Sequence, residues 1–166
     1  MNRKILFRGK RVDNGEWITG SLIDAKGKAY IIVSVETECL DGKNTDLYAT
    51  EWYEVLPDTI CQYTGLTDKN GKKIWENDIF KCYLLNKYAS IKYGTYQIGF
   101  DSRLIINVGF YADWSEDSSL KLRKDLGYWV NVEEIEIIGN IFDSSELLDE
   151  KRGWSRLSYE NCKRWY

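Results

Sequence analysis

The stretch from Pro57 to Phe80 reads PDTICQYTGLTDKNGKKIWENDIF, and it decides the fold class. Residues Thr59 to Thr64 alternate apolar and polar side chains, as a half-buried strand does. Asn70-Gly71 is the strongest short-range hairpin signal, and it predicts a type I′ turn with positive φ at both residues. Glu76-Asn77-Asp78 is a second turn before a strand over Ile79–Leu85. The stretch therefore predicts antiparallel β structure.

Three segments of this stretch resemble the YopX family of phage and prophage proteins from Gram-positive bacteria. They are QYTGL at 62–66, DKNGK at 68–72 and IWENDI at 74–79. The N-terminal FRGK and GEW segments and the later IIGNIF segment are also similar, so the resemblance runs from about residue 3 to 149. The family usually has glycine where this chain has Asn77, and asparagine tolerates the left-handed φ of such a turn. The resemblance implies a phage or prophage origin and names no biochemical role.

Composition places the chain among globular proteins. Its 166 residues fit one domain with appendages, and its aromatic content of 14% favours strands. The N-terminal apolar run is too short for a signal peptide, and no stretch approaches the roughly 18 apolar residues of a membrane span. We therefore expect no membrane partner, reduced thiols and, with the family resemblance, a location in the bacterial host cytoplasm. The net charge of −3 does not suggest bulk affinity for nucleic acid.

The N-terminal third predicts a meander of three strands. These are an edge strand over Lys4–Lys10 and further strands over Glu16–Ile23 and Ala29–Val35. We favour a solvated edge for the basic first strand over a phosphate-binding arm. Glu38–Asp46 is expected to be a loop, followed by a strand over Tyr48–Val55.

Downstream of residue 85 the sequence predicts further short strands and little helix. Ser90–Phe100 is expected to be a bent strand with bulges or corners at Gly94 and Gly99. The other expected elements are a strand over Leu104–Phe110, a loop over 113–126, a strand over Glu136–Phe142, a short helix over Ser144–Leu148 and an amphipathic helix carrying Trp154, Leu157 and Trp165.

These elements predict a mainly β protein of eight to ten strands. The sheets are expected to be antiparallel and curved, with a small SH3-like barrel over Ile79–Phe142. The expected divisions are an N-terminal β-meander at 1–56, a YopX-like β-barrel region at 57–149 and a helical tail at 150–166.

The residue inventory limits the possible chemistry. The chain has no histidine, which excludes histidine-based triads and metal sites. Cys39, Cys61, Cys82 and Cys162 lack the local pairs of zinc sites, and we interpret them as small buried hydrophobic residues. No phosphate-binding glycine motif occurs.

Carboxylates are the remaining catalytic candidates. Glu76 and Asp78 would share one face of a strand and, with Asp58 or Asp68 nearby, suit a hard cation. We favour the alternative in which they cap backbone amides in turns. The sequence thus predicts no catalytic, cofactor-binding or metal-binding residues, no cofactor and no enzyme activity.

We interpret the chain as a phage-encoded binding or assembly module without catalysis, with a host or phage protein as partner. A nucleic-acid-binding accessory protein is the first alternative; its basic patch would join the N-terminal strand to Lys151, Arg152, Arg156, Lys163 and Arg164. A carboxylate enzyme with a divalent metal is the second. Trp154, Trp165 and Tyr166 also predict a closed homo-oligomer, or a tail that covers its own barrel.

Overall fold

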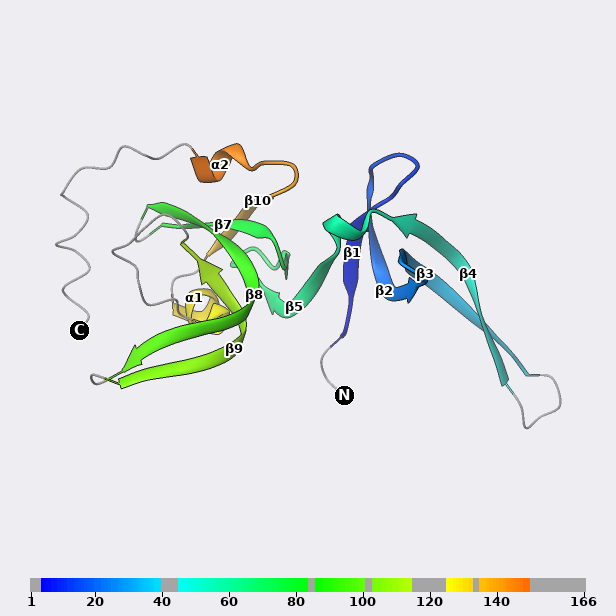
Figure 1. Cartoon of the computed structure of the whole chain (residues 1–166), viewed down its shortest axis with the longest axis horizontal. Coiled ribbons are helices and arrows are strands. Elements are labelled where there is room, and N and C mark those ends of the chain that lie inside the picture. Colours follow the sequence, from blue (N-terminus) through cyan, green and yellow to red (C-terminus); the bar gives the residue numbers. More distant parts are fainter. Residues whose placement is uncertain are drawn as a thin grey trace. The chain divides into compact units, whose positions relative to one another are not determined.

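The computed structural model describes residues 4–39, 45–83, 86–100, 103–114, 125–132 and 135–149 (Figure 1). In these residues the chain forms ten strands, two short α-helices and one 3₁₀ turn. Seven pairs of neighbouring strands in these residues are antiparallel. The prediction of a mainly β antiparallel protein is confirmed. The chain divides into two compact units, Met1–Gly65 and Leu66–Tyr166, while the predicted divisions at 56 and 149 stay predictions.

The first unit is a sheet with the order β4-β3-β2-β1-β5. Its elements are β1 (Phe7–Lys10), β2 (Trp17–Ala25), β3 (Lys28–Cys39), β4 (Thr45–Val55), the 3₁₀ turn η1 (Pro57–Thr59) and β5 (Cys61–Thr67), whose last residues enter the second unit. The predicted meander is present, but the prediction that its first strand lies at an edge is wrong. β1 lies between β2 and β5, since Arg8 pairs with both Thr19 and Cys61.

The turns of the first unit follow local chemistry. A two-residue turn joins β2 to β3, with φ of 54° at Lys26 and 80° at Gly27, which is the type I′ pattern. The loop predicted over Glu38–Asp46 is shorter than expected, because β3 continues to Cys39 and pairs there with Thr45 of β4. Alternating apolar and acidic residues continue the ladder where polarity alone indicated a loop.

The core of the first unit is small. Ala29, Ile31 and Val55 are buried there, and four partly buried residues pack against them: Phe7, Ile18, Leu22 and Ile60. Gly20 lies against the backbone of β3, since an added Cβ would lie 2.0 Å from the carbonyl oxygen of Ile32. From Val33 onward every described residue of β3 is exposed, so this core ends at Ile32.

The second unit contains a four-stranded sheet with the order β10-β7-β8-β9. Its elements are β6 (Lys73–Trp75), β7 (Asp78–Cys82), β8 (Lys87–Phe100), β9 (Arg103–Asp113), α1 (Leu126–Val132), β10 (Glu136–Asn140) and α2 (Glu146–Asp149). β6 is the neighbour of β5 in the other sheet. Among the described strands β9 and β10 are the outer ones, so the SH3-like barrel prediction is not confirmed. The chain between them forms α1, which covers the apolar face of the sheet instead of adding a strand that closes it.

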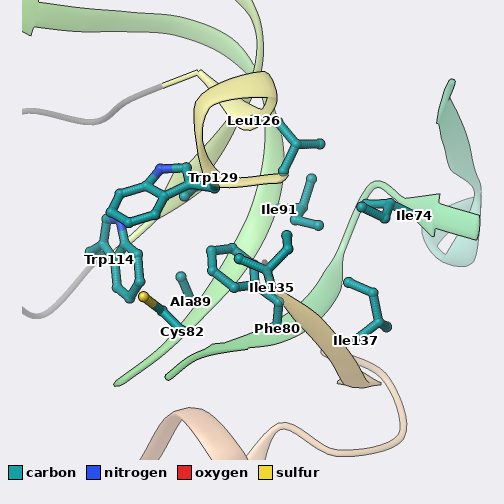
Figure 2. Close-up of a cluster of buried hydrophobic side chains, with 11 residues drawn as sticks. Ile74, Phe80, Cys82, Ala89, Ile91, Trp114, Leu126, Trp129, Ile135 and Ile137 are labelled. Carbon is teal, nitrogen blue, oxygen red and sulfur yellow. The ribbon is translucent and has the colours of Figure 1, made fainter. Parts of the chain in front are cut away.

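The core of the second unit is rich in aromatic side chains (Figure 2). Phe80 of β7 is fully buried and contacts Trp114 edge to face, with ring centroids 5.5 Å apart. Trp129 of α1 packs on Trp114 at 4.9 Å, and Leu126, one turn earlier on the same helix, is also buried. Leu126 and Trp129 are three residues apart, which is the spacing of apolar side chains on one face of a helix. The loop predicted at 113–126, with room for one helical turn, lies mostly outside the described residues, and a helix over Leu126–Val132 was not predicted.

The long hairpin of β8 and β9 is regular. Its pairs run from Ser90↔Asp113 to Phe100↔Arg103 with no shift in register, so neither Gly94 nor Gly99 forms a bulge, whereas β8 is bent as predicted (Figure 1). Gly94 pairs with Gly109, and the stacked rings of Tyr96 and Tyr111 lie over this glycine pair with centroids 5.3 Å apart. The predicted C-terminal helix over Trp154–Tyr166 lies outside the described residues.

Candidate functional site

The turn at residues 68–72 is a hairpin loop in which residues 69–71 connect the paired residues Asp68 and Lys72. The amide of Gly71 donates to the carbonyl of Asp68 at 2.9 Å, and the amide of Asp68 donates to the carbonyl of Lys72 at 2.9 Å. Gly71 has φ of 77°, but Asn70 does not have positive φ. The predicted type I′ turn is therefore wrong. Gly71 is the left-handed residue of this loop, and the arrangement therefore needs glycine at 71 only.

The Asp68 carboxylate holds this turn and joins it to β10. Oδ1 accepts hydrogen bonds from the amides of Asn70 and Lys72, each at 2.9 Å. Oδ2 accepts one from the buried amide of Ile137 at 3.0 Å. Asp68 is only 6% exposed, and the Lys69 amide adds a second link to β10 by donating to the carbonyl of Ile135. The carboxylate therefore acts as a structural acceptor for three backbone amides.

Asp78 has a similar role in the next turn. It is 1% exposed, and its Oδ2 accepts a hydrogen bond from the amide of Trp75 at 2.9 Å. Asn77 has φ of 64°, as the asparagine-for-glycine argument predicted, and its amide donates to the carbonyl of Ile91. Because this residue is left-handed, Glu76 and Asp78 are not alternate residues of one extended strand. Glu76 is half-buried in the turn, and Asp58 is exposed in η1.

The described residues contain no group of three or more Cys, Asp or Glu side chains that could hold a metal ion. Asp78 accepts a hydrogen bond from a backbone amide, as the turn-capping interpretation predicted, and Asp68, for which no such role was predicted, also accepts backbone amides. Cys61 and Cys82 are buried, whereas Cys39 is exposed at the end of β3, contrary to expectation. Cys162 lies outside the described residues.

A polar cluster that the sequence did not predict lies where β7 meets β10. Lys69 Nζ lies 2.8 Å from Glu136 Oε2, the Tyr83 hydroxyl donates to the same oxygen, and the Lys69 ammonium lies 4.1 Å from the centroid of the Tyr83 ring. The hydrogen bond from Lys69, and then that from Tyr83, lower the pKa of Glu136. The hydrogen bond to Glu136 raises the pKa of Lys69 and of Tyr83. The sequence did not indicate this cluster, because Glu136 is more than 50 residues away from both Lys69 and Tyr83 along the chain.

The cationic side chains of the N-terminal strand form cation–π contacts with nearby aromatic rings. The Arg8 guanidinium lies 4.7 Å from the Trp17 ring centroid, and Lys10 Nζ lies 5.6 Å from it. Arg11 forms an ion pair with Asp13 and stacks on Tyr53 at 3.8 Å. The tail lysines and arginines of the alternative nucleic-acid patch lie outside the described residues.

Exposed apolar side chains mark the outer parts of both long hairpins. We call residues 33–39 and 45–51 the arm; here β3 and β4 continue together past their pairing with β2 (Figure 1). Val35 pairs with Ala49 and Thr37 with Leu47, so these four side chains share one face, the apolar face of the arm. Val35 is 51% exposed and Leu47 is 68% exposed.

The opposite face of the arm is acidic. Glu36 pairs with Tyr48, and Glu38 pairs with Asp46. The Tyr48 hydroxyl donates to Glu36 at 3.3 Å. With Glu51, the arm carries four acidic residues and no lysine or arginine. It is thus a two-stranded ribbon with one apolar and one acidic face, and isolated two-stranded hairpins are at best marginally stable in water.

The outer part of the β8–β9 hairpin has a face without charge. The pairs Tyr93↔Phe110, Thr95↔Val108 and Gln97↔Ile106 place their side chains on the same side. Tyr93, Ile106 and Val108 are 56%, 64% and 68% exposed. We call these three pairs the uncharged face.

Comparison with known proteins assigns the chain to a family. Residues 6–149 match the family described as YopX protein. The chain belongs to the YopX family. No curated protein matches it. A solved structure, that of protein EF1440 from Enterococcus faecalis, is similar with a TM-score of 0.56 and 20% identity, over 88% of this chain and 99% of that one. At this identity the likeness shows the fold alone.

The region that matches the YopX family includes the residues and surfaces described above. It spans Asp68, the Lys69–Glu136 cluster, the arm and the uncharged face, and it ends before the tail at 150–166. No helix in the described part of this YopX-family chain is long and apolar enough to span a membrane. The alternating side chains at 33–39 and 45–51 were the available signal for the arm, since the alternation includes the first and last residues of the segment 38–46, which was expected to be a loop.

Proposed function

We propose that this YopX-family protein is a non-catalytic binding or assembly module, encoded by a phage or prophage and acting in the cytoplasm of its bacterial host. One observation carries the proposal: apolar side chains such as Leu47 and Val108, each 68% exposed, are grouped on the outer parts of two hairpins. Grouped apolar side chains on a sheet face are typical of surfaces that bind another protein.

The placement of the carboxylates supports a role without catalysis. A catalytic or metal-binding carboxylate needs an oxygen directed at the substrate or the ion. Asp68 instead accepts bonds from three backbone amides, and Asp78 accepts one from Trp75. These contacts give Asp68 and Asp78 a role in folding.

The charges on the two hairpins favour a protein partner over nucleic acid. The arm carries four acidic residues, and the uncharged face offers no cation to a phosphate group. Nucleic-acid binding depends on lysine and arginine contacts to phosphates. We therefore propose a host or phage protein as the partner, together with self-association of this chain.

Affinity capture from prophage-induced host cells tests the proposal. The tagged protein is compared with Leu47→Glu and Val108→Glu, and with Val12→Glu as the matched control. Val12 is also exposed, at 52%, but lies outside both faces. We expect a specific protein that Val12→Glu retains and that at least one of the other two variants loses.

Two outcomes would contradict the proposal. One is the recovery of nucleic acid that nuclease or high salt removes, which supports the nucleic-acid alternative. The other is metal-dependent thermal stabilisation that disappears in Glu76→Ala or Asp78→Ala, which supports the enzyme alternative.

A further inference from the structure

The arm has an apolar face that no described element covers. It extends beyond β2, and its apolar side chains Val35 and Leu47 are at least half exposed. Both edges of this ribbon also lack a neighbouring strand among the described residues. Exposed strands with apolar side chains invite association, and proteins usually cover or charge them. The acidic face is charged, but the apolar face is not.

The charge of the arm restricts what can cover it. Its four acidic residues repel a second acidic surface, including another arm, at long range. They attract a segment in which lysine and arginine flank apolar side chains. Contacts of this kind are stabilised by apolar burial and steered by charge.

The C-terminal tail of this chain has that composition. Residues 150–166 read EKRGWSRLSYENCKRWY, with five cationic and two anionic side chains. In the helix that the sequence predicts over Trp154–Tyr166, Trp154, Leu157 and Trp165 share one stripe, and Arg164 flanks this stripe on one side. Lys151 lies three residues before the first residue of the helix. A helix from 154 to 165 would be about 18 Å long at 1.5 Å per residue. The seven residues 33–39 of the arm span a similar length, about 23 Å at 3.3 Å per residue.

We infer that the arm binds the C-terminal tail of a second copy of this chain. The tryptophan stripe packs on the apolar face around Val35 and Leu47. Lys151 and Arg164 reach the acidic side chains Glu38 and Asp46 around the two edges of the narrow ribbon. This inference rests on the proposed binding role and names its first partner.

Exchange between two copies makes the contact twice. Each copy gives its tail to the arm of the other, which closes a dimer with two identical contacts. Stable interfaces bury roughly 1,200–2,000 Å². Two identical contacts bury twice the area of one contact on a narrow hairpin face, so they come closer to the area that a stable interface needs.

Reversed charges test the exchange in the full-length protein. The arm variant is Glu38→Lys with Asp46→Lys, and the tail variant is Lys151→Glu with Arg164→Glu. Light scattering coupled to size exclusion is measured at micromolar concentration in low salt. We expect the wild type at twice 19.5 kDa and each variant alone at 19.5 kDa. Raising the salt from 50 to 500 mM should weaken the wild-type dimer several-fold, because salt screens exposed charges.

Mixing the two variants gives the deciding result. The reversed arm of one variant complements the reversed tail of the other, and the two unchanged segments complement each other as well. The mixture should therefore form a heterodimer, although each variant alone is monomeric. A mixture that stays monomeric overturns the exchange, as does a wild type that is monomeric across the dilution series.

A second pair of variants locates the contact. Leu47→Glu should raise the Kd of the dimer at least tenfold, whereas Val108→Glu on the uncharged face should leave this Kd unchanged. The reverse pattern overturns the assignment to the arm. Circular dichroism of each variant confirms that folding is retained. A monomeric protein that still captures a foreign partner would refute the exchange and the self-association of this chain, but it would leave the proposed role in binding another protein standing.

Discussion

Replacing Asp68 by alanine should destabilise the protein strongly. Its carboxylate is buried and accepts three backbone hydrogen bonds, two within the turn at 68–72 and one from Ile137 of β10. The substitution removes all three acceptor contacts at once. It therefore affects both the turn and its connection to β10.

The expected magnitude follows from the burial of each donor. The Ile137 amide is part of a buried hydrogen bond, and leaving such a donor without its charged acceptor costs about 2–3 kcal/mol. The amides of Asn70 and Lys72 are in partly buried bonds, so water replaces part of each contact and the loss is about 0.5–1 kcal/mol per bond. The total is about 3–5 kcal/mol of the free energy of unfolding.

Urea denaturation of Asp68→Ala against Asp58→Ala measures this loss. Asp58 is exposed, and the same change there should stay within about 0.5 kcal/mol of the wild type. Hydrogen exchange of the Ile137 amide should also be faster in Asp68→Ala, because its acceptor is gone. If Asp68→Ala unfolds within about 0.5 kcal/mol of Asp58→Ala, the carboxylate does not hold the turn to β10 and the argument fails.

Three further predictions concern backbone conformation and charge. Gly71→Val should lower the free energy of unfolding in urea by about 1–2 kcal/mol, because the φ of Gly71 is 77°. Gly71→Asn should lower it less, because asparagine tolerates this φ and no atom lies within 4 Å of an added Cβ. Equal losses in the two variants would point to a steric cause. Gly20→Ala should cost at least about 3 kcal/mol, because the added Cβ overlaps the Ile32 carbonyl, and a thermal midpoint equal to that of the wild type would contradict this close approach. The pKa of Glu136 is lowered, so its pairing with Lys69 stabilises the fold above the ordinary carboxyl pKa of 4.5 and is lost as the pH falls through the lowered value. The pKa of Lys69 is raised, so its share is present below 10.5 and is lost as the pH rises through the raised value. The stability difference between wild type and Glu136→Gln should therefore be constant from about pH 6 to pH 9 and shrink at pH 3, and a difference independent of pH would exclude this pairing.

Local sequence chemistry predicted the strands and their turns well. Asn77 takes the left-handed φ that its position required, and Gly71 does the same. Both outcomes depend on a few adjacent residues. The exact turn type at Asn70-Gly71 was wrong, because the Asp68 carboxylate accepts the amides of Asn70 and Lys72 and stabilises the three-residue loop. A side chain outside the dipeptide decides the turn.

Long-range packing could not be predicted in the same way. α1 is only seven residues long, and its helical character depends on the burial of Leu126 and Trp129 against Phe80 and Trp114. Helices of this length are not stable alone, so the tertiary contact decides the conformation. The Lys69–Glu136 pair also joins residues far apart in sequence. The sequence therefore identified the carboxylates as turn residues but not the cluster beside them.

The arm shows why an alternating pattern has two possible meanings. Alternation predicts a strand with one apolar face, and this holds for Val35, Thr37, Leu47 and Ala49. The pattern does not tell whether the apolar face is covered within the chain or by another molecule. In the first unit the core ends at Ile32, and the apolar alternation continues for several residues beyond it. Those residues add nothing to the core of the unit, and exposed apolar side chains increase the risk of aggregation. No described element of the chain buries them, and the proposed contact with a second molecule would do so.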